Sequence, residues 1–473
     1  MMALQFLRRG KIVSIESFAP DTMLLDYLRL QERSVGTKEG CNEGDCGACT
    51  VVLGEACNGR MTYRAVNACI LFLGQIHGKE LITVEDLSEG GKLHPVQQAM
   101  VDMHASQCGF CTPGFVMSLF ALGHAKEKVT RDDVTLAIAG NLCRCTGYRP
   151  IIDAGLKACS SLKDKFSVDE AVAVAALEDL DQGELFVGDD RAFFAAPASS
   201  DGVAALASQF PEARIVSGAT DVGLWVTKQL RPQKQIIYTG RATGLRASAA
   251  TGSGVLIGAG ASYSDAIEIL RSTLPNDFVT VIERIGSVQV RNSGTIGGNI
   301  ANGSPIGDMP PMLIALGATI TLRYGRTERR IPLESFFIDY GRQDRKPGEL
   351  VWNINVPKPE SDQHFRAYKI SKRFDQDISA VMGAFLFTLY RDRIEDVRIA
   401  FGGMAPTPKR ALKTEVALRG KRLAEAMSVR LEDYVPISDM RASATYRLET
   451  AQALLTKALL ELQGETQTRV FAA

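Results

Sequence analysis

The sequence predicts an α+β protein built from several domains. The chain has 473 residues, enough for about three or four domains of roughly 100–200 residues each. Hydrophobic residues make up 45% of the chain, so each domain can bury a core. Two cysteine motifs lie in different surroundings, the first among short strand patterns and the second among helical ones. We therefore expect two small cysteine-containing domains and, after them, a larger region of mixed strands and helices.

Charge and hydropathy exclude several classes of protein. Lys+Arg and Asp+Glu both number 54, a balance that argues against a nucleic-acid or anionic-membrane partner. No apolar run approaches the roughly 18 residues of a membrane span. The stretch from Met1 to Lys11 lacks a long apolar region with a cleavage site. We expect a cytoplasmic protein, in which ten cysteines indicate metal ligation more than disulfides.

The first cysteine motif comprises Cys41, Cys46 and Cys49, with Cys69 as a distant fourth member. The Cys-x4-Cys-x2-Cys spacing is typical of a plant-type 2Fe–2S ferredoxin loop. A zinc knot or a disulfide pair is the alternative, but zinc sites favour two paired knuckles. Around the motif, residues 4–7 and 12–15 read as a hairpin, and Pro20-Asp21-Thr22 as the cap of a helix. We assign residues 1–87 to a ferredoxin-like domain of the β-grasp type.

The second cysteine motif lies in a helical region, residues 88–165. Helical patterns begin at His94-Pro95 and cover 115–122, 132–139 and 151–159, a four-helix unit. The motif pairs Cys-x2-Cys with Cys-x-Cys, and its members are Cys108, Cys111, Cys143 and Cys145. Two close pairs also suit zinc, so zinc stays a rival; the neighbouring ferredoxin-type loop favours a second 2Fe–2S cluster. The remaining Cys57 and Cys159 are interpreted as packing residues.

Residues 166–192, mixed alanine and acidic, read as a linker before an α/β region, 193–362. A strand at 214–216 runs into the glycine-containing turn 217–223, and 254–260 is a second strand and turn. Polar glycine stretches follow at 292–299 and 302–308. Such loops present N–H groups and small hydroxyls to phosphate oxygens, whereas the plain alternative is a set of tight turns. We expect a dinucleotide phosphate site here.

The last region, 363–473, begins with strand patterns and becomes helical after Leu412, ending in a helix over 446–462. It reads as a small α+β domain. The five histidines are scattered and are interpreted as structural. No nucleophile–base arrangement is visible, so no catalytic residue is assigned to this chain.

Taken together, these motifs resemble the molybdenum hydroxylase family, and within it the small iron–sulfur and FAD subunit of bacterial two-subunit xanthine dehydrogenases. The resemblance covers nearly the whole chain except the linker. It is carried by these stretches: 36–50, 107–114, 140–148, 218–223, 295–299, 304–308, 368–378 and 401–404.

The resemblance implies an order of redox groups. The cluster at Cys108, Cys111, Cys143 and Cys145 would be nearer a molybdenum cofactor on a partner subunit, with Gln107 and Cys145 facing its pterin. The cluster at Cys41, Cys46, Cys49 and Cys69 would be nearer FAD. The flavin domain would have the vanillyl-alcohol oxidase type of fold. The implied FAD contacts are Ile215, Val216, Ser217, Gly218, Ala219, Thr220, Asp221, Val222, Ile285, Thr295, Ile296, Gly297, Gly298, Asn299, Asp308, Val351 and Lys369.

The implied function is electron transfer during hydroxylation of hypoxanthine and xanthine to urate. Electrons would pass from molybdopterin on a large partner subunit through both clusters to FAD and then to NAD+, in a heterotetramer of two small and two large subunits. Two departures stand out. Ala219 replaces a glycine or asparagine of the relatives, and Gly341, after Tyr340, replaces an arginine near the expected nicotinamide site. The alternatives are the same role in a hydroxylase of aldehydes or other N-heterocycles, or a carrier without flavin.

Overall fold

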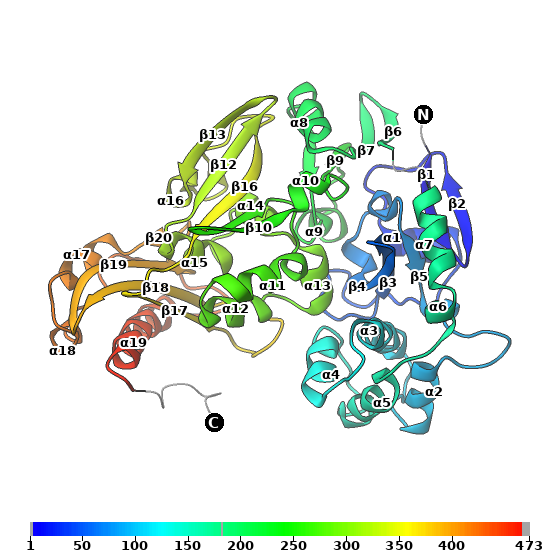
Figure 1. The fold of residues 1–473 in the computed structure, drawn as a ribbon, viewed down its shortest axis with the longest axis horizontal. Coiled ribbons are helices and arrows are strands. Elements are labelled where there is room, and N and C mark those ends of the chain that lie inside the picture. Colours follow the sequence, from blue (N-terminus) through cyan, green and yellow to red (C-terminus); the bar gives the residue numbers. More distant parts are fainter. Residues whose placement is uncertain (1–2, 181–182, 466–473) are drawn as a thin grey trace. The chain divides into compact units, whose positions relative to one another are not determined.

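The computed structural model describes residues 3–180 and 183–465. The chain divides into two compact units (Figure 1). Unit 1 comprises Met1–Gly244 and Gly286–Gly294, and unit 2 comprises Leu245–Ile285 and Thr295–Ala473. The division does not follow chain order, because a nine-residue segment from the later part of the chain belongs to unit 1. None of the described helices combines the length and the apolar character needed to span a membrane.

Unit 1 begins with a five-stranded sheet in the order β2-β1-β5-β3-β4. The predicted hairpin is confirmed, with Leu4 opposite Ile15. The predicted cap is wrong, because the helix follows Met23 and no side chain caps it. The elements are β1 (Leu4–Arg8), β2 (Lys11–Ile15), α1 (Leu24–Asp26), η1 (Tyr27–Gln31), β3 (Thr50–Cys57), β4 (Arg60–Asn67), η2 (Ala68–Ile70), η3 (Leu73–Ile76), β5 (Glu80–Ile82) and η4 (Val84–Asp86).

Four helices follow, as predicted: α2 (Pro95–Asp102), α3 (Thr112–Ala125), α4 (Arg131–Ile138) and α5 (Arg149–Cys159). They lie together in Figure 1. The central helix is α3, whose residues from Gly114 to Ala121 are all buried. A helix that is apolar all round must be covered on every side, and α3 has α2, α4, α5 and β3 as neighbours. Cys159 is buried at the end of α5, with its thiol donating to the Leu119 carbonyl.

The predicted linker contains regular structure. It holds α6 (Lys165–Val168), α7 (Glu170–Asp179) and the first strand of a new sheet, β6 (Leu185–Asp189). Leu177 and Leu180 pack with Leu7 of β1, and the Glu170 carboxylate accepts from the Met61 N–H at 2.9 Å. The alanine content that suggested a linker is favourable to a helix. The domain limits themselves stay predictions.

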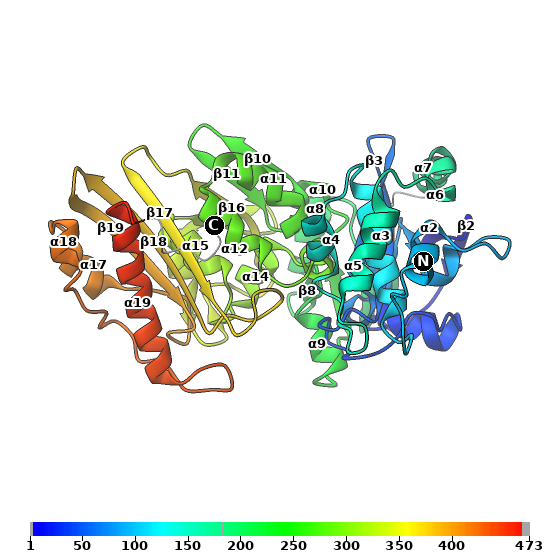
Figure 2. The same cartoon turned by 90° about the horizontal axis from the view of Figure 1, so that it is seen from below.

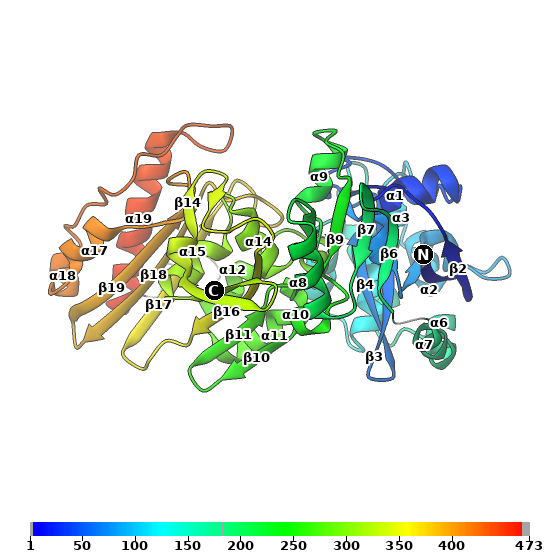
Figure 3. The same ribbon diagram turned by 90° about the horizontal axis from the view of Figure 1, so that it is seen from above.

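A second sheet in unit 1 has the order β6-β7-β9-β8. Figure 3 shows β6, β7 and β9 side by side, with α8 beside β9. The β7–β9 and β8–β9 pairs are parallel. The elements are β7 (Ala192–Ala196), α8 (Ser200–Gln209), β8 (Arg214–Val216), α9 (Val222–Thr227), β9 (Gln235–Tyr238) and, from the late segment, α13 (Val288–Ser293); α10 (Thr243–Arg246) spans the division of the chain.

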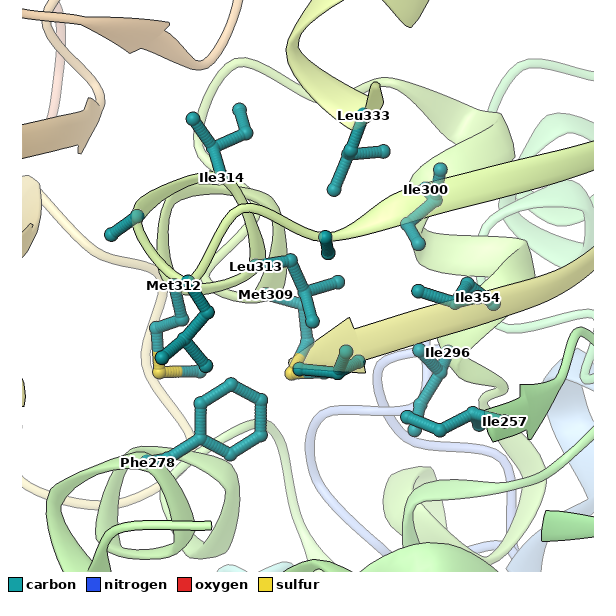
Figure 4. Close-up of a cluster of buried hydrophobic side chains, with 14 of the residues drawn as sticks. Ile257, Phe278, Ile296, Ile300, Met309, Met312, Leu313, Ile314, Leu333 and Ile354 are labelled. Carbon is teal, nitrogen blue, oxygen red and sulfur yellow. The ribbon is translucent and has the colours of Figure 1, made fainter. Parts of the chain in front are cut away.

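Unit 2 contains a five-stranded sheet in the order β10-β11-β16-β12-β13 and a separate β14-β15 pair. Its core includes Phe278, Met312 and Ile354 (Figure 4). The elements are β10 (Ser248–Thr251), β11 (Gly254–Gly258), α11 (Tyr263–Thr273), α12 (Asn276–Glu283), α14 (Ile296–Asn302), α15 (Met309–Ala315), β12 (Thr319–Tyr324), β13 (Thr327–Pro332), α16 (Leu333–Phe336), β14 (Phe337–Asp339), β15 (Arg342–Gln343) and β16 (Leu350–Pro357).

The C-terminal part of unit 2 is the predicted strand-then-helix region. Its sheet has the order β17-β18-β19-β20, and α19 lies along β17 and β18 (Figure 2). The predicted last helix over 446–462 is confirmed, with a start two residues earlier. The elements are β17 (Gln363–Ile370), β18 (Val381–Tyr390), β19 (Arg393–Gly402), β20 (Lys409–Arg410), α17 (Leu412–Leu418), α18 (Leu423–Ala426) and α19 (Ala444–Leu462).

Candidate functional site

The structure brings the first four cysteines together. Cys41 Sγ accepts from the N–H groups of Asp45 at 3.3 Å and Cys46 at 3.2 Å, and Cys46 Sγ accepts from the Cys41 N–H at 3.3 Å. The thiol of Cys69 hydrogen-bonds with those of Cys41 and Cys49, and these neighbours together with burial raise its pKa. Cys49 and Cys69 are buried, whereas Cys41 and Cys46 are half-buried. The loop thus presents four thiols and several N–H donors to one place.

The second four cysteines form two thiol pairs. The thiol of Cys108 hydrogen-bonds with that of Cys145. Burial, and then the neighbouring Cys143 thiol, raises the pKa of the Cys111 thiol to about 12. Cys143 Sγ also accepts from the Cys145 N–H at 3.4 Å. Cys108 and Cys145 are exposed, so this set reaches the surface of unit 1.

The donor chemistry of both sets fits iron–sulfur clusters. The first set offers four thiols linked by hydrogen bonds, and the second offers two thiol pairs. In both sets backbone N–H groups point at sulfur atoms, as a negatively charged cluster requires. Among the described residues, no group of three or more His, Cys, Asp or Glu side chains is arranged around one metal-ion position. The pairs Cys108–Cys145 and Cys111–Cys143 each join one cysteine of the Cys-x2-Cys half to one of the Cys-x-Cys half. The two halves of the second motif therefore lie together.

The two cysteine loops touch directly. The Leu142 N–H donates to the Cys46 carbonyl at 2.9 Å, and Leu142 precedes Cys143. Next to this bond, Asn141 Nδ2 donates to the Gly47 carbonyl at 3.0 Å. Gly47 has a φ of +68°, and a Cβ there would lie 2.2 Å from the Gly140 carbonyl oxygen. Only glycine allows both the backbone angle and this approach.

The turn between β8 and α9 is a candidate anion site in unit 1. Among the described residues, no acceptor pairs with the backbone N–H groups of 218–222. Ala219 has a φ of +61°, and alternating backbone conformations of this kind make N–H groups converge on an anion. A Cβ on Gly218 would lie 2.1 Å from the Ser293 carbonyl oxygen. The residues therefore fit a phosphate group, which is the part of FAD that such a turn can hold.

This turn is attached to the first cysteine loop. Gln75 Nε2 donates to the Ser217 carbonyl at 3.2 Å. A Cβ on Gly223 would lie 2.7 Å from the Ile70 carbonyl oxygen, so α9 packs on the residue that follows Cys69. Lys228 pairs with Glu43, inside the cysteine loop, at 3.5 Å. The candidate anion turn and the first cysteine set are therefore neighbours within unit 1.

The polar glycine stretch 292–299, predicted as a phosphate-binding loop, is largely helical. Thr295 caps α14, and its Oγ1 accepts from the Gly298 N–H at 3.1 Å. The N–H groups of Ile296 and Gly297 donate to the carbonyls of Ala261 and Ala259. The stretch is therefore a capped helix start and not an open loop, and the phosphate contact at Thr295 to Asn299 stays a prediction. The stretch was predicted as a loop because of its glycine pair, but the Thr295 cap favours a helix start at this position.

Side chains in unit 2 offer other polar groups. The buried Asn299 Oδ1 has no hydrogen-bond partner among the described residues. Lys369 Nζ donates to Asp308 Oδ2 at 2.7 Å and to the Arg284 carbonyl at 3.0 Å. Ser379 Oγ donates to the second oxygen of Asp308. Ile285, which follows Arg284, and Val351 pack against the core of this unit. Asp308, Lys369 and the segment 284–285 are thus brought together.

Four family models match successive parts of the chain. Residues 7–73 match a 2Fe-2S iron-sulfur cluster binding domain, and residues 83–156 match a [2Fe-2S] binding domain. Residues 190–359 match the FAD binding domain in molybdopterin dehydrogenase, and residues 366–462 match the CO dehydrogenase flavoprotein C-terminal domain.

The relatives agree with these domains. Xanthine dehydrogenase/oxidase of Gallus gallus is 31% identical over 88% of this chain and 36% of that protein. Xanthine dehydrogenase of Drosophila pseudoobscura pseudoobscura is 34% identical over 87% of this chain and 35% of that protein. The chain is homologous to the iron–sulfur and flavin regions of the molybdenum hydroxylases. It spans only about a third of the length of these relatives.

A solved structure of carbon monoxide dehydrogenase is similar as well. A chain of carbon monoxide dehydrogenase from Hydrogenophaga pseudoflava superposes with a TM-score of 0.53 and 28% identity, over 56% of this chain and 95% of that chain. The prediction of an α+β protein with iron–sulfur and flavin domains of the molybdenum hydroxylases is confirmed at this level.

Several buried polar residues of the site were not predicted. Thr50, Ser118, Asn141 and Gln289 form one hydrogen-bonded group at the contact of the cysteine loops. Asn141 lies beside the second motif, which is a local signal. Gln289 is 148 residues from Asn141 in sequence, and no pattern pointed to it.

Proposed function

We propose that the chain is the electron-transfer subunit of a molybdenum hydroxylase. In this role it passes electrons from a molybdenum cofactor on a partner subunit, through two 2Fe–2S clusters, to FAD and then to NAD+. When bound, the clusters exchange single electrons and FAD links them to hydride transfer. The observation that carries the proposal is the continuous contact within unit 1 from the second cysteine set through the first to the anion turn.

The eight cysteines would hold the clusters. Cys41, Cys46, Cys49 and Cys69 are proposed as ligands of one, and Cys108, Cys111, Cys143 and Cys145 as ligands of the other. The Leu142 N–H and the Cys46 carbonyl join the two loops by one hydrogen bond. Backbone donors to Cys41 and Cys143 stabilise the thiolates, which favours the reduced, more negative cluster.

The proposed FAD contacts form two sets of residues, one in each unit. In unit 1 they are Ile215 to Val222, where the unpaired N–H groups support a phosphate contact. In unit 2 they are Ile285, Thr295 to Asn299, Asp308, Val351 and Lys369, where side chains rather than backbone donors would make the contacts. Lys369 Nζ lies 2.7 Å from Asp308 Oδ2 and fixes the orientation of this side chain, so the carboxylate can accept a hydrogen bond from a hydroxyl of the ligand.

A partner subunit is proposed at the second cysteine set. Cys108 and Cys145 are exposed there, and so are the apolar side chains of Phe110, 48% exposed, and Leu142, 40% exposed. Apolar side chains around an exposed redox group suit a protein interface better than free solvent. We place the molybdopterin subunit on this face, with Gln107 and Cys145 toward its cofactor, in an assembly of two small and two large subunits in the cytoplasm.

NAD+ as the acceptor and xanthine as the substrate of the complex are finer parts of the proposal. The xanthine dehydrogenases among the relatives, such as that of Drosophila pseudoobscura pseudoobscura, favour them. Tyr340, proposed near the nicotinamide, is 74% exposed, and Gly341 beside it has a φ of +66°. An aldehyde oxidase of Cavia porcellus is 29% identical, so a hydroxylase of aldehydes or N-heterocycles is the second candidate. Assays of the whole complex with xanthine and with aldehydes decide between the two.

The test uses the chain alone, loaded with FAD. It should contain about four iron atoms in two clusters, oxidise NADH with a dye acceptor and fail to hydroxylate xanthine. Cys108→Ser should halve the iron and leave the NADH reaction, while Cys57→Ser, at an exposed position on β3, should change neither. Zinc in place of iron, or no NADH–dye activity, would overturn the proposal.

A further inference from the structure

The contact between the two cysteine loops contains a residue from a distant part of the chain. Gln289 lies in the first turn of α13 and is 1% exposed. Its Nε2 donates to Ser118 Oγ at 3.0 Å, to Asn141 Oδ1 at 3.1 Å and to Thr50 Oγ1 at 3.4 Å. These three partners belong to α3, the second cysteine loop and the first strand after the first cysteine loop. One carboxamide thus joins three elements of unit 1.

Each partner is itself fixed to a cysteine loop. Asn141 Nδ2 donates to the Gly47 carbonyl at 3.0 Å and to Thr50 Oγ1 at 3.2 Å. Thr50 Oγ1 also donates to the Gly47 carbonyl at 2.6 Å, and Ser118 Oγ donates to Asn141 Oδ1 at 2.7 Å. All four residues of the group are at most 2% exposed. Gln289 Oε1 has no hydrogen-bond partner among the described residues, whereas its Nε2 group pairs with all three neighbours. A buried network with this many paired donors and acceptors favours one arrangement of the elements that it joins.

The helix α13 also reaches the anion turn. Asn292 Nδ2 donates to the Ala65 carbonyl of β4 at 2.9 Å, and the Ser293 carbonyl at the end of the helix packs against Gly218. At its other end, Gln289 Oε1 lies where a Cβ on Gly140 would come within 2.3 Å. The short helix α13 therefore contacts three parts of unit 1: the second cysteine loop, strand β4 and the candidate anion turn.

We propose that Gln289 is a positioning residue of the redox chain, which sets the register between the two cluster loops. It acts through Asn141 and Thr50 on the Leu142–Cys46 hydrogen bond. The inference rests on the proposed function, because the register affects electron transfer only when both loops hold clusters. Without the carboxamide, Asn141 and Ser118 lose a buried donor and the two loops gain freedom to separate.

Gln289→Leu tests this, because it keeps the size of the side chain and removes its hydrogen bonds. In the reduced full-length chain, the magnetic splitting between the two cluster signals should change, since dipolar coupling depends steeply on distance. Hydrogen exchange at the Leu142 amide should become at least about tenfold faster. The matched control is Gln452→Leu, which removes two hydrogen bonds of another glutamine, to Leu431 and Val429, and should change neither quantity.

Ser118→Ala provides a milder variant if the first one loses its clusters. It removes one donor to Asn141 and should accelerate Leu142 exchange in the same direction by a smaller factor. A Gln289→Leu chain with parental splitting and parental Leu142 exchange would overturn the proposal, even if its melting temperature were lower. Absence of iron from the parent would refute the proposed function instead, and the exchange measurement would still report on Gln289.

Discussion

Ala219 occupies a backbone conformation that its side chain disfavours. Its φ of +61° lies in the left-handed region, which costs a residue with a Cβ about 1–2 kcal/mol. The neighbouring Gly218 has no space for a Cβ because the Ser293 carbonyl lies against it. Ala219 therefore adopts the backbone conformation of the turn with strain. Gly218 allows the close approach of the Ser293 carbonyl because it has no Cβ.

Opposite effects are expected from exchanging these two residue types. Ala219→Gly should raise the free energy of unfolding by up to about 1 kcal/mol and leave FAD affinity intact. Gly218→Ala should lower it by about 2–4 kcal/mol and weaken FAD binding, because the turn must move away from Ser293. Urea unfolding and flavin titration of both variants measure this. Equal FAD affinity in the two variants would contradict the assignment of the turn.

Glu80 is a buried carboxyl whose ionisation opposes folding. Burial, with a further contribution from Asp86, raises the pKa of Glu80 to about 7 from its ordinary 4.5. Its Oε2 has no hydrogen-bond partner in the described part of the chain. Since the folded state binds this proton more tightly than the unfolded state, the contribution to stability is full below about pH 4.5 and declines as the pH rises through 7.

Glu80→Gln removes that pH dependence. The difference in unfolding free energy between variant and parent should change by about 2–3 kcal/mol in favour of the variant from pH 5 to pH 8. The size of the difference at pH 5 does not affect this change. Urea unfolding of unit 1 at the two pH values checks the gain. A constant difference between parent and variant across this range would show that the carboxyl is already ionised in the folded protein.

At the scale of elements, hydrogen bonds from two histidines to one aspartate connect helices of the helical domain. Asp164 Oδ2 accepts from His94 Nε2 at 2.7 Å, at the start of α2, and from His124 Nε2 at 2.9 Å, at the end of α3. Burial works to raise the pKa of Asp164, but the hydrogen bonds from His124 and His94 hold it well below its usual range. The carboxylate therefore stabilises the domain above about pH 4, and this contribution is lost as the pH falls through the folded-state pKa.

Asp164→Asn should lower the stability of unit 1 by about 3 kcal/mol at pH 7, since hydrogen bonds to a charged group are the strong ones. The control is Asp132→Asn, at an exposed position in the first turn of α4, which should cost less than about 0.5 kcal/mol. Chemical unfolding of both variants gives the comparison. Similar losses in the two would show that the histidine pairs contribute little.

Local signals explain which elements were predictable. The cysteine spacings, the hairpin of β1 and β2 and the four helices α2 to α5 depend on residues close together in sequence, and all were found. The glycine pair of α14 and the alanine-rich α7 were misread because composition was weighed above capping and helix propensity. Gln289 could not be found, because its partner Thr50 is 239 residues away and one glutamine in a helix has many plausible roles.

On the scale of the whole molecule, the large apolar cores lie within single units. Those of unit 1 include Phe72 and Phe120, and those of unit 2 include Phe278 and Phe385. Units with separate cores commonly unfold separately, and a single unfolding free energy then has no meaning. Unit 2 also has its own buried charge: Arg447 is 1% exposed and donates to Asp439 and to the Ala380 carbonyl.

Calorimetry of the whole chain should therefore show two transitions. Asp164→Asn should shift only one of them, and Arg447→Met, which removes the ion pair of Asp439 with Arg447, should shift only the other. A single transition that both variants move together would show that the chain unfolds as one cooperative body.

The late segment of unit 1 has a consequence for how the protein is made. A chain leaves the ribosome at about 5–20 residues per second and folds from its N-terminal end. The body of unit 1 is complete in sequence at Gly244, but the segment Gly286–Gly294 emerges only after a further stretch that belongs to unit 2. For those seconds Thr50, Ser118 and Asn141 face water instead of Gln289. The contact between the two cysteine loops therefore gains the hydrogen bonds of Gln289 only after α13 has been synthesised.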